Sequence, residues 1–123
     1  MAGHNQLGHL GEALACTHLE ELGYRILERN WRYDRAEIDI IAEKEELLVV
    51  VEVKTRNTEF FGRPSEFVSQ RKQELLMKAA EAYLESENLQ SEVRFDIVGV
   101  VIDPAWPDKP GIRHIPGAFS AFG

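Results

Sequence analysis

The sequence has little cysteine and no long apolar segment. Cys16 is the only cysteine among its 123 residues, which excludes an internal disulfide framework and a cysteine-rich zinc site. No apolar run approaches the roughly 20 residues that a membrane span requires, and the first residues, MAGHNQLGH, lack the apolar stretch of a signal peptide. We therefore expect a cytoplasmic protein without a membrane partner. Any metal it binds should be a hard cation held by carboxylates.

Charge is distributed unevenly along the chain. Residues 1–23 carry three acids and no lysine or arginine, residues 24–72 carry ten charges of each sign, and residues 73–123 carry eight acids against four cations. The net charge of -7 argues against a protein that coats nucleic acid nonspecifically, although a local basic patch is enough to hold phosphates. The composition, with 44% hydrophobic and 28% charged residues, is typical of a globular protein. We expect a single domain over 1–123.

Hydrophobic periodicity predicts a mixed α/β fold. The predicted elements are, in chain order, a helix over 4–22, strands over 24–31, 37–42 and 47–54, a loop over 55–64, a helix capped by Ser65 or a neighbour and ending near Glu87, and a strand over 93–102. The second and third strands are expected to form a hairpin, and the fourth has to join the sheet through the long helical connection. This αβββαβ order predicts a mixed central sheet flanked by helices.

The segment after residue 102 is rich in proline. It holds four of the five prolines of the chain together with several aromatic residues. We expect residues 103–123 to form an irregular tail, with a short edge strand at 112–115 as the alternative.

The strand over 47–54 ends in two charged residues after an apolar run. The apolar residues alternate over both faces, so this strand should be buried on both sides. Glu52 and Lys54 share one face because they are two residues apart. Asp39 of the preceding strand can pair beside Glu52 across the hairpin, where the two carboxylates would repel each other. A hard divalent cation such as magnesium would relieve that repulsion. An ion pair on a solvated sheet face is the alternative explanation.

A lysine beside two carboxylates also suggests a reaction. Lys54 could position a water molecule or stabilise the charge that accumulates on a phosphate oxygen during hydrolysis. With a bound metal, this is the arrangement for metal-assisted cleavage of a phosphodiester bond. Glu12 begins the apolar stripe of the first helix and so adds a carboxylate on a line that faces the core.

A resemblance to a known family is carried by four segments, GEALACTHLEELGYRILERNWR, AEIDIIA, VVEVKTR and VRFDIVGV. Together they resemble the PD-(D/E)XK nuclease superfamily and, more closely, the YraN-like family of uncharacterised bacterial proteins, which is similar to archaeal Holliday junction resolvases. The resemblance covers roughly residues 7–102. It implies a restriction-endonuclease-like fold in which Asp39 and Glu52 bind magnesium or manganese. Lys54 would be the catalytic lysine, and Glu12 a further acidic residue of the site.

The chain departs from the family pattern at Ala36. Such sequences usually have glycine before Glu-Ile-Asp. The difference leaves the acidic residues in place but could alter the turn into the second strand.

Several cations lie where they could hold a nucleic-acid backbone. Arg56, Arg71 and Lys72 flank the loop and the start of the second helix, and we assign them to nucleic-acid binding. Lys72 also falls on the apolar line of its helix, so its stem could instead extend along the edge of the core. A second series comprises Arg25, Arg29, Arg32 and Arg35, with Trp31 and Tyr33 available to stack on unpaired bases. Solvated surface charge, and core packing for Trp31, are the alternatives.

The remaining polar residues have simpler explanations. Asp96 shares a strand face with Arg94, which favours a local ion pair over catalysis. The four histidines have no zinc-like spacing, and no serine or cysteine has the sequence context of a nucleophile triad.

The sequence therefore predicts a metal-dependent endonuclease that hydrolyses phosphodiester bonds of DNA with water as the nucleophile. The expected substrate is branched or single-stranded DNA. A homodimer would suit it, because resolvase-like enzymes cut symmetric junctions in pairs. Two alternatives stay open. One is a nucleic-acid-binding or protein-interaction module that keeps the fold without turnover, and the other is a purely structural domain whose site charges form satisfied ion pairs.

Overall fold

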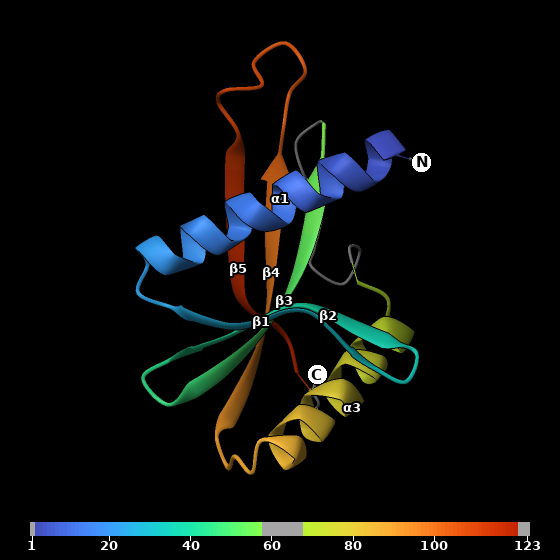
Figure 1. Cartoon of the computed structure of the whole chain (residues 1–123), viewed down its shortest axis with the longest axis vertical. Coiled ribbons are helices and arrows are strands. Elements are labelled where there is room, and N and C mark those ends of the chain that lie inside the picture. Colours follow the sequence, from blue (N-terminus) through green and yellow to red (C-terminus); the bar gives the residue numbers. More distant parts are fainter. Residues whose placement is uncertain (1, 58–67, 121–123) are drawn as a thin grey trace.

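Five strands form one mixed sheet, with α1 packed on one face and α3 on the other (Figure 1). The computed structural model describes residues 2–57 and 68–120, with side chains from residue 6 onward. Its elements are α1 (Ala2–Glu21), β1 (Arg25–Tyr33), β2 (Ala36–Lys44), β3 (Leu47–Arg56), α3 (Gln70–Ser86), β4 (Glu92–Val101) and β5 (Gly111–Phe119). The prediction of a mixed α/β fold is confirmed, and the arrangement is consistent with a restriction-endonuclease-like architecture.

Within the described ranges, no helix combines the length and the apolar character needed to cross a membrane.

The strand order in the sheet is β1-β2-β3-β4-β5. β1, β2 and β3 form an antiparallel meander, which confirms the predicted hairpin of β2 and β3. β4 runs parallel to β3, with Ile97 level with Glu52. The chain therefore has to return across one face of the sheet between these strands, and α3 lies on that crossing.

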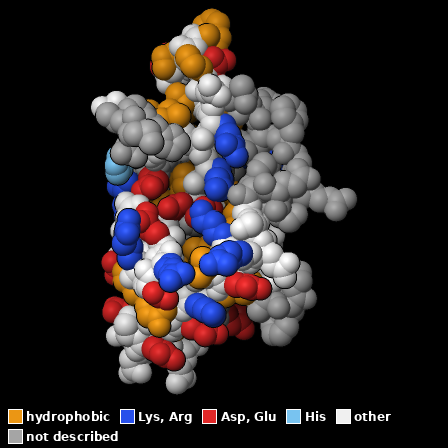
Figure 2. Space-filling model, turned by 90° about the vertical axis from the view of Figure 1, so that its right-hand side faces the viewer, with side chains coloured by type: hydrophobic (Ala, Val, Ile, Leu, Met, Phe, Trp, Pro, Cys, Tyr) orange, Lys and Arg blue, Asp and Glu red, His pale blue; other side chains and the backbone are white. Residues whose placement is uncertain are grey.

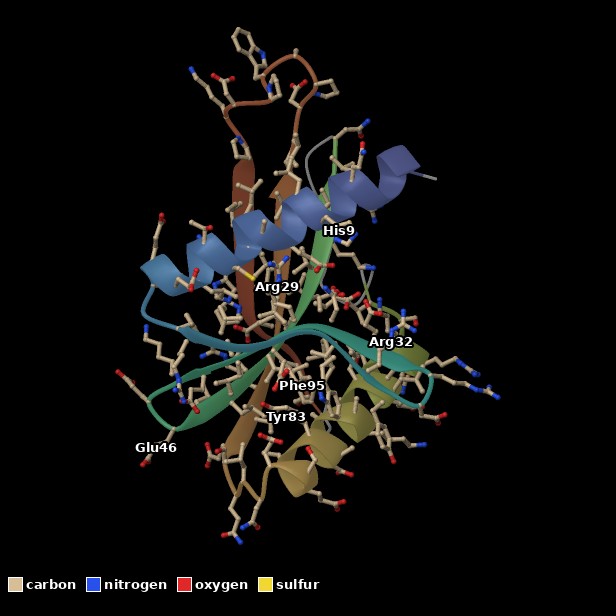
Figure 3. All side chains as sticks on the ribbon, in the orientation of Figure 1. His9, Arg29, Arg32, Glu46, Tyr83 and Phe95 are labelled. Atoms are coloured by element: carbon tan, nitrogen blue, oxygen red, sulfur yellow. The ribbon has the colours of Figure 1, made fainter. Side chains whose placement is uncertain are left out.

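Each face of the sheet buries its own apolar cluster. Val49 of β3 packs with Leu19 of α1 on one face, and Val50 packs with Tyr83 of α3 on the other. This is possible because successive side chains of a strand point to opposite faces. Tyr83 and Phe95 lie between the sheet and α3 (Figure 3). Burial on both faces explains why the sequence of β3 is a continuous apolar run.

The side chains of β2 switch from one face of the sheet to the other at one residue. Ile38 belongs to the cluster under α3, whereas Ile40 belongs to the cluster under α1, although a regular strand would put both on one face. Asn30, opposite this point on β1, has a positive φ of 53° and is skipped in the ladder between the pairs on either side of it. Asp39 lies between the two isoleucines, so it stands where the strand rotates.

The start of β2 tolerates the departure from the family pattern. Ala36 is its first residue and is buried, and the left-handed backbone of the preceding turn falls on Asp34, with φ 55°. Aspartate adopts this conformation more readily than most residues. Alanine therefore fits where the family usually has glycine.

α3 begins later than predicted. Ser69 caps it with an extended backbone, and its hydroxyl accepts a 3.2 Å hydrogen bond from the Lys72 N–H. The expected cap Ser65 lies outside the described residues, as do residues 58–64 of the predicted loop. Residues 55 and 56 of that loop belong to β3 instead, because β4 continues to pair with them.

The expectation of an irregular tail over 103–123 is wrong for residues 111–119, which form the edge strand β5. This strand is longer than the alternative at 112–115; residues 121–123 lie outside the description.

Asp96 of β4 gives the physical reason why this segment is ordered as a strand. Its side chain is fully buried, and a buried charge needs partners. Its carboxylate accepts hydrogen bonds from Arg94 at 2.8 Å, His114 Nε2 at 2.8 Å and the Gly117 N–H at 3.0 Å. β5 supplies two of these partners, and the predicted pairing with Arg94 is confirmed.

Candidate active site

The site forms where β2 and β3 move apart. Ile40 and Val51 are their last paired residues in this direction, so Asp39 and Glu52 come next, as the hairpin predicted. Asp39 leaves the ladder, and its Oδ2 accepts a 2.8 Å hydrogen bond from the Val53 N–H. A backbone group of β3 thereby fixes the carboxylate of β2 beside Glu52.

Glu52 is almost fully enclosed and is neutralised by two lysines. Its side chain is 3% exposed; its Oε2 pairs with Lys72 Nζ and lies 3.5 Å from Lys54 Nζ. Its Oε1 is buried and accepts no hydrogen bond from any described residue. Lys54 follows on β3, as its spacing predicted, whereas Lys72 comes from the first turn of α3. Two elements therefore contribute ammonium groups to one carboxylate.

Asp39 has a strongly perturbed acidity. Burial raises the pKa of its carboxyl, the adjoining charge of Glu52 raises it further, and the Val53 N–H only partly opposes them, so the pKa moves from 3.8 to about 8. Without a cation the carboxyl therefore keeps its proton at neutral pH. That proton relieves the repulsion between the two acids.

Glu12 reaches the same place from α1. Gly11 allows this, because a Cβ at that position would lie 1.9 Å from Thr55 Oγ1 and 3.0 Å from Thr55 Cβ, so the helix backbone rests directly on the end of β3. Glu12 Oε1 is buried without a hydrogen bond to any described residue and lies 3.9 Å from Arg29 Nη2. Arg29 lies between α1 and the sheet (Figure 3).

A cavity of about 310 Å³ brings together all four residues predicted for catalysis. Its lining is Leu7, Gly8, Glu12, Asp39, Glu52, Val53, Lys54, Thr55, Arg56 and Lys72. Arg56 and Lys72, predicted to bind nucleic acid, therefore lie at the same cavity. Arg71 instead lines a neighbouring pocket of about 280 Å³ with Arg35, and Lys72 borders both spaces. Figure 2 shows lysine and arginine side chains gathered around acidic ones on the face that carries the start of α3.

A larger cavity of about 550 Å³ lies at the opposite end of the β2–β3 hairpin. Its lining combines Glu43, Glu45, Glu46 and Glu92 with neutral residues. Figure 3 places Glu46 at this end, far from Arg32 at the other. Size alone does not make it a reaction site, because its described lining lacks the mixture of carboxylates and cations that the smaller cavity has.

The donor set of the smaller cavity fits a hard divalent cation. Among the described residues, no three His, Cys, Asp or Glu side chains converge to form a protein-only metal cage. Magnesium does not require one, because it binds through one or two carboxylates and keeps several waters. Asp39 and Glu52 supply those carboxylates, and the unpartnered Oε1 of Glu52 is an available donor.

Three arginines of the second predicted series lie on β1 and are paired, Arg29 with Glu12 as described above, whereas the fourth, Arg35, lines the neighbouring pocket. Arg25 and Arg32 form ion pairs with glutamates of β2. Trp31 packs edge-on against Tyr83 with ring centroids 5.2 Å apart, so the explanation by core packing is right for Trp31. Tyr33 stacks on Trp31 and is 48% exposed.

Sequence analysis did not identify two features that shape the site. One is the contact of Lys72 with Glu52, which joins residues 20 positions apart and has no local sequence signal. The other is Gly11, which the sequence could have indicated. Glycine inside a helix costs about 0.5–1 kcal/mol relative to alanine, so its presence in the predicted helix points to a close approach of another backbone.

The sequence matches a family model and several bacterial relatives. The model of the uncharacterised protein family UPF0102 matches residues 11–100. A UPF0102 protein of Flavobacterium johnsoniae is 49% identical over 126 residues, covering 99% of this chain and 100% of the relative. One from Flavobacterium psychrophilum is 53% identical over 100 residues, covering 81% and 84%, and one from Christiangramia forsetii is 45% identical over 122 residues, covering 99% and 100%. The four cavity residues predicted for catalysis all fall within the matched segment.

Proposed function

This chain belongs to the uncharacterised protein family UPF0102, the YraN-like family that its motifs resemble, and we propose that it is a metal-dependent endonuclease acting on DNA. One observation carries the proposal: two adjoining carboxylates, Asp39 and Glu52, share one cavity with Lys54 just beyond the point where the pairing of β2 and β3 ends. Gathering such charges in a poorly solvated place is costly. Metal-assisted phosphodiester hydrolysis would give each of these three charged groups a role.

Each side chain would have its own task. Asp39 and Glu52 would hold the metal ion, which when bound polarises a phosphate oxygen and lowers the pKa of water. Lys54, 3.5 Å from Glu52 Oε2, is placed to orient the attacking water or to stabilise charge on the phosphate. Glu12 would accept a hydrogen bond from a cavity water through its Oε1, which accepts none from a described residue.

The wider assignment extends the same proposal. It includes membership of the PD-(D/E)XK superfamily, a likeness to archaeal Holliday junction resolvases, and branched or single-stranded DNA as the substrate. It also includes magnesium or manganese as the cofactor, a cytoplasmic location, and a homodimer that cuts both sides of a symmetric junction. The cations at the cavity support a nucleic-acid partner despite the net charge of -7.

Cleavage of defined DNA tests the proposal. The pure protein is incubated with labelled single-stranded, duplex, flap and four-way-junction DNA in magnesium, manganese or chelator. We expect metal-dependent cutting. Lys54→Ala and Asp39→Asn should each lower its rate by about 10²-fold or more, while circular dichroism shows a retained fold. The first removes a group aimed at the developing charge, and the second removes a metal ligand.

Two variants provide matched controls. Lys78→Ala and Asp108→Asn make similar charge changes at exposed positions outside the cavity lining. Both should cut at the wild-type rate. Undiminished cutting by Lys54→Ala and Asp39→Asn, or no cutting of any substrate by the wild type, contradicts the proposal.

The second candidate is a nucleic-acid-binding or protein-interaction module without turnover. The pairing of Glu52 with Lys54 and Lys72 favours it, because these charges already satisfy one another. It predicts metal-independent binding of the same DNA, measured by fluorescence anisotropy, with no cutting. A purely structural role is less well supported, because Oε1 of Glu12 is buried and has no hydrogen-bond partner among the described residues.

A further inference from the structure

We infer that Lys72 exchanges between two partners, holding Glu52 in the metal-free protein and a substrate phosphate once a divalent cation binds the carboxylates. The inference rests on the proposed function and adds to it a coupling between cation binding and phosphate binding. It concerns a residue of α3, outside the strand motifs that carry the family resemblance.

The contacts identify Lys72 as the movable partner. Its Nζ contacts Glu52 Oε2, and Lys54 Nζ lies 3.5 Å from the same atom. Glu52 is 3% exposed, whereas the side chain of Lys72 is 42% exposed and that of Lys54 25% exposed. The enclosed carboxylate is held in place, while Lys72 reaches it from the open side of the cavity on a long flexible stem.

The charges of the cavity make the exchange necessary. Around Glu52, the carboxylates of Asp39 and Glu52 can carry two negative charges at most against the two positive ones of Lys54 and Lys72; Glu12 and Arg56 add one charge of each sign to the cavity lining. A divalent cation at the two carboxylates would add two positive charges next to an oxygen that Lys72 already contacts. Because like charges at such a distance repel strongly in a poorly solvated place, the more exposed ammonium has to leave.

The neighbouring pocket provides the second position. Lys72 borders this space of about 280 Å³ together with Arg35 and Arg71. Among the described residues of its lining, the one acid is Glu37, which is paired with Arg32 at 2.9 Å. Three cations on one pocket favour an anion, and the anion that accompanies a reacting phosphodiester is the next phosphate of the same strand. Lys72 would hold that phosphate while the reacting one lies over Asp39 and Glu52.

Binding of the cation and of the phosphate should therefore reinforce each other. In the wild type, Lys72 competes with the cation for Glu52, and release of Lys72 completes the phosphate pocket. Such coupling is reciprocal, because each ligand changes the affinity for the other by the same factor. Loss of Lys72 should tighten cation binding, weaken phosphate binding and reduce the coupling between them to what direct contact of cation and phosphate supplies.

Calorimetry on the full chain tests this without any turnover. Manganese is titrated alone and with thymidine 3′,5′-bisphosphate, a probe that carries two phosphates and no phosphodiester bond. Lys72→Gln should bind manganese about 5-fold tighter or more than the wild type, as expected for typical coupling strengths. The bisphosphate should gain less affinity from the metal than it does in the wild type, because only direct contact between metal and phosphate is left. Lys72→Arg keeps the charge and can hold a carboxylate through two hydrogen bonds, so it should bind manganese no more tightly than the wild type. Lys78→Gln, an exposed change on the same helix, should match the wild type.

The outcomes separate this inference from the proposed function. Equal manganese affinity of Lys72→Gln and wild type overturns the exchange, although metal-dependent DNA cutting by the wild type would still stand. Tighter manganese binding with an intact gain for the bisphosphate also overturns it, because removal of a nearby charge would then be the whole effect. If neither protein binds manganese, both proposals fail. If Lys72→Gln does not fold, tighter manganese binding by Lys72→Arg overturns the exchange by itself.

Discussion

At the scale of single residues, two acids share one place and are neutralised in different ways. Glu52 is paired with ammonium groups, and Asp39 keeps a proton because burial and the charge of Glu52 raise its pKa to about 8. Both arrangements are reversible, since a lysine side chain can move and a proton can leave. The folded chain therefore tolerates these acids without a cation, and both arrangements could give way to the cation of the proposed function.

The raised pKa of Asp39 makes the stability of the metal-free protein depend on pH. Between pH 3.8 and about 8 the unfolded chain has lost this proton and the folded chain retains it. Stability should therefore fall as pH rises through that window. Asp39→Asn cannot ionise, so it should be less sensitive to pH and more stable than the wild type above pH 8. Urea unfolding in chelator at pH 6 and pH 8.5 measures this, with Asp108→Asn as control; equal pH slopes for Asp39→Asn and wild type would refute it.

At the scale of elements, the contact between α1 and β3 sets the position of Glu12. The helix can rest on the strand end only because residue 11 has no side chain. A Cβ added at Gly8, one turn earlier, would have no heavy atom of another described residue within 4 Å. Only Gly11 is therefore needed for the close contact with β3, although both glycines lie in the same helix.

Alanine substitutions should separate these two glycines. Gly8→Ala should stabilise the protein by about 0.5–1 kcal/mol through helix propensity. Gly11→Ala gains the same propensity, but its Cβ would overlap Thr55, and such overpacking typically costs about 1–3 kcal/mol. We expect a net loss of stability in denaturant unfolding, with partial recovery in the double variant Gly11→Ala with Thr55→Ala. Stabilisation by both single substitutions would show that the close approach is not tight.

Elements with a local pattern were predictable, and long-range contacts were not. The apolar run of β3 and its hairpin with β2 predicted the neighbours Asp39 and Glu52, because strand periodicity and a short turn determine both. The ion pair of Lys72 with Glu52 depends on how α3 crosses the sheet, which no local spacing encodes. The strand β5 was hidden by its prolines, since the partners that order it, above all Asp96, lie on another strand.

At the scale of the whole molecule, Asp96 ties together segments far apart in the chain. Burial would raise its pKa, but hydrogen bonds from His114, Arg94 and the Gly117 N–H outweigh burial and lower it. Arg94 in turn donates to the Tyr24 hydroxyl at 2.6 Å, so the network runs from the start of β1 to β5. The edge strand β5 is therefore attached to the sheet through the Asp96 carboxylate as well as through its backbone pairing with β4.

Loss of this carboxylate should affect global stability. Asp96→Ala leaves buried donors and the Arg94 charge without their partner, a change that typically costs about 3–5 kcal/mol. Because the pKa of Asp96 is lowered in the folded state, its contribution is present above pH 3.8 and is lost as pH falls through the lower folded value. Acid and urea unfolding should show a lower free energy of unfolding for the variant. That free energy should also fall less steeply than in the wild type as the pH is lowered. Asp103→Ala, an exposed change, should stay within about 0.5 kcal/mol of the wild type; an equally small effect at Asp96 would contradict the role of the network.

The neutralised carboxylates also bear on which metal the chain would acquire. Since a proton and lysines balance Asp39 and Glu52, the polypeptide can finish folding before any cation arrives, and the folded site would then select among the ions of the cell. No imidazole or thiolate is among the described lining residues, and these are ligands that zinc and copper favour over magnesium and manganese. Selection by a completed oxygen-lined pocket would disfavour zinc and copper, the ions that bind most tightly to a flexible newly made chain.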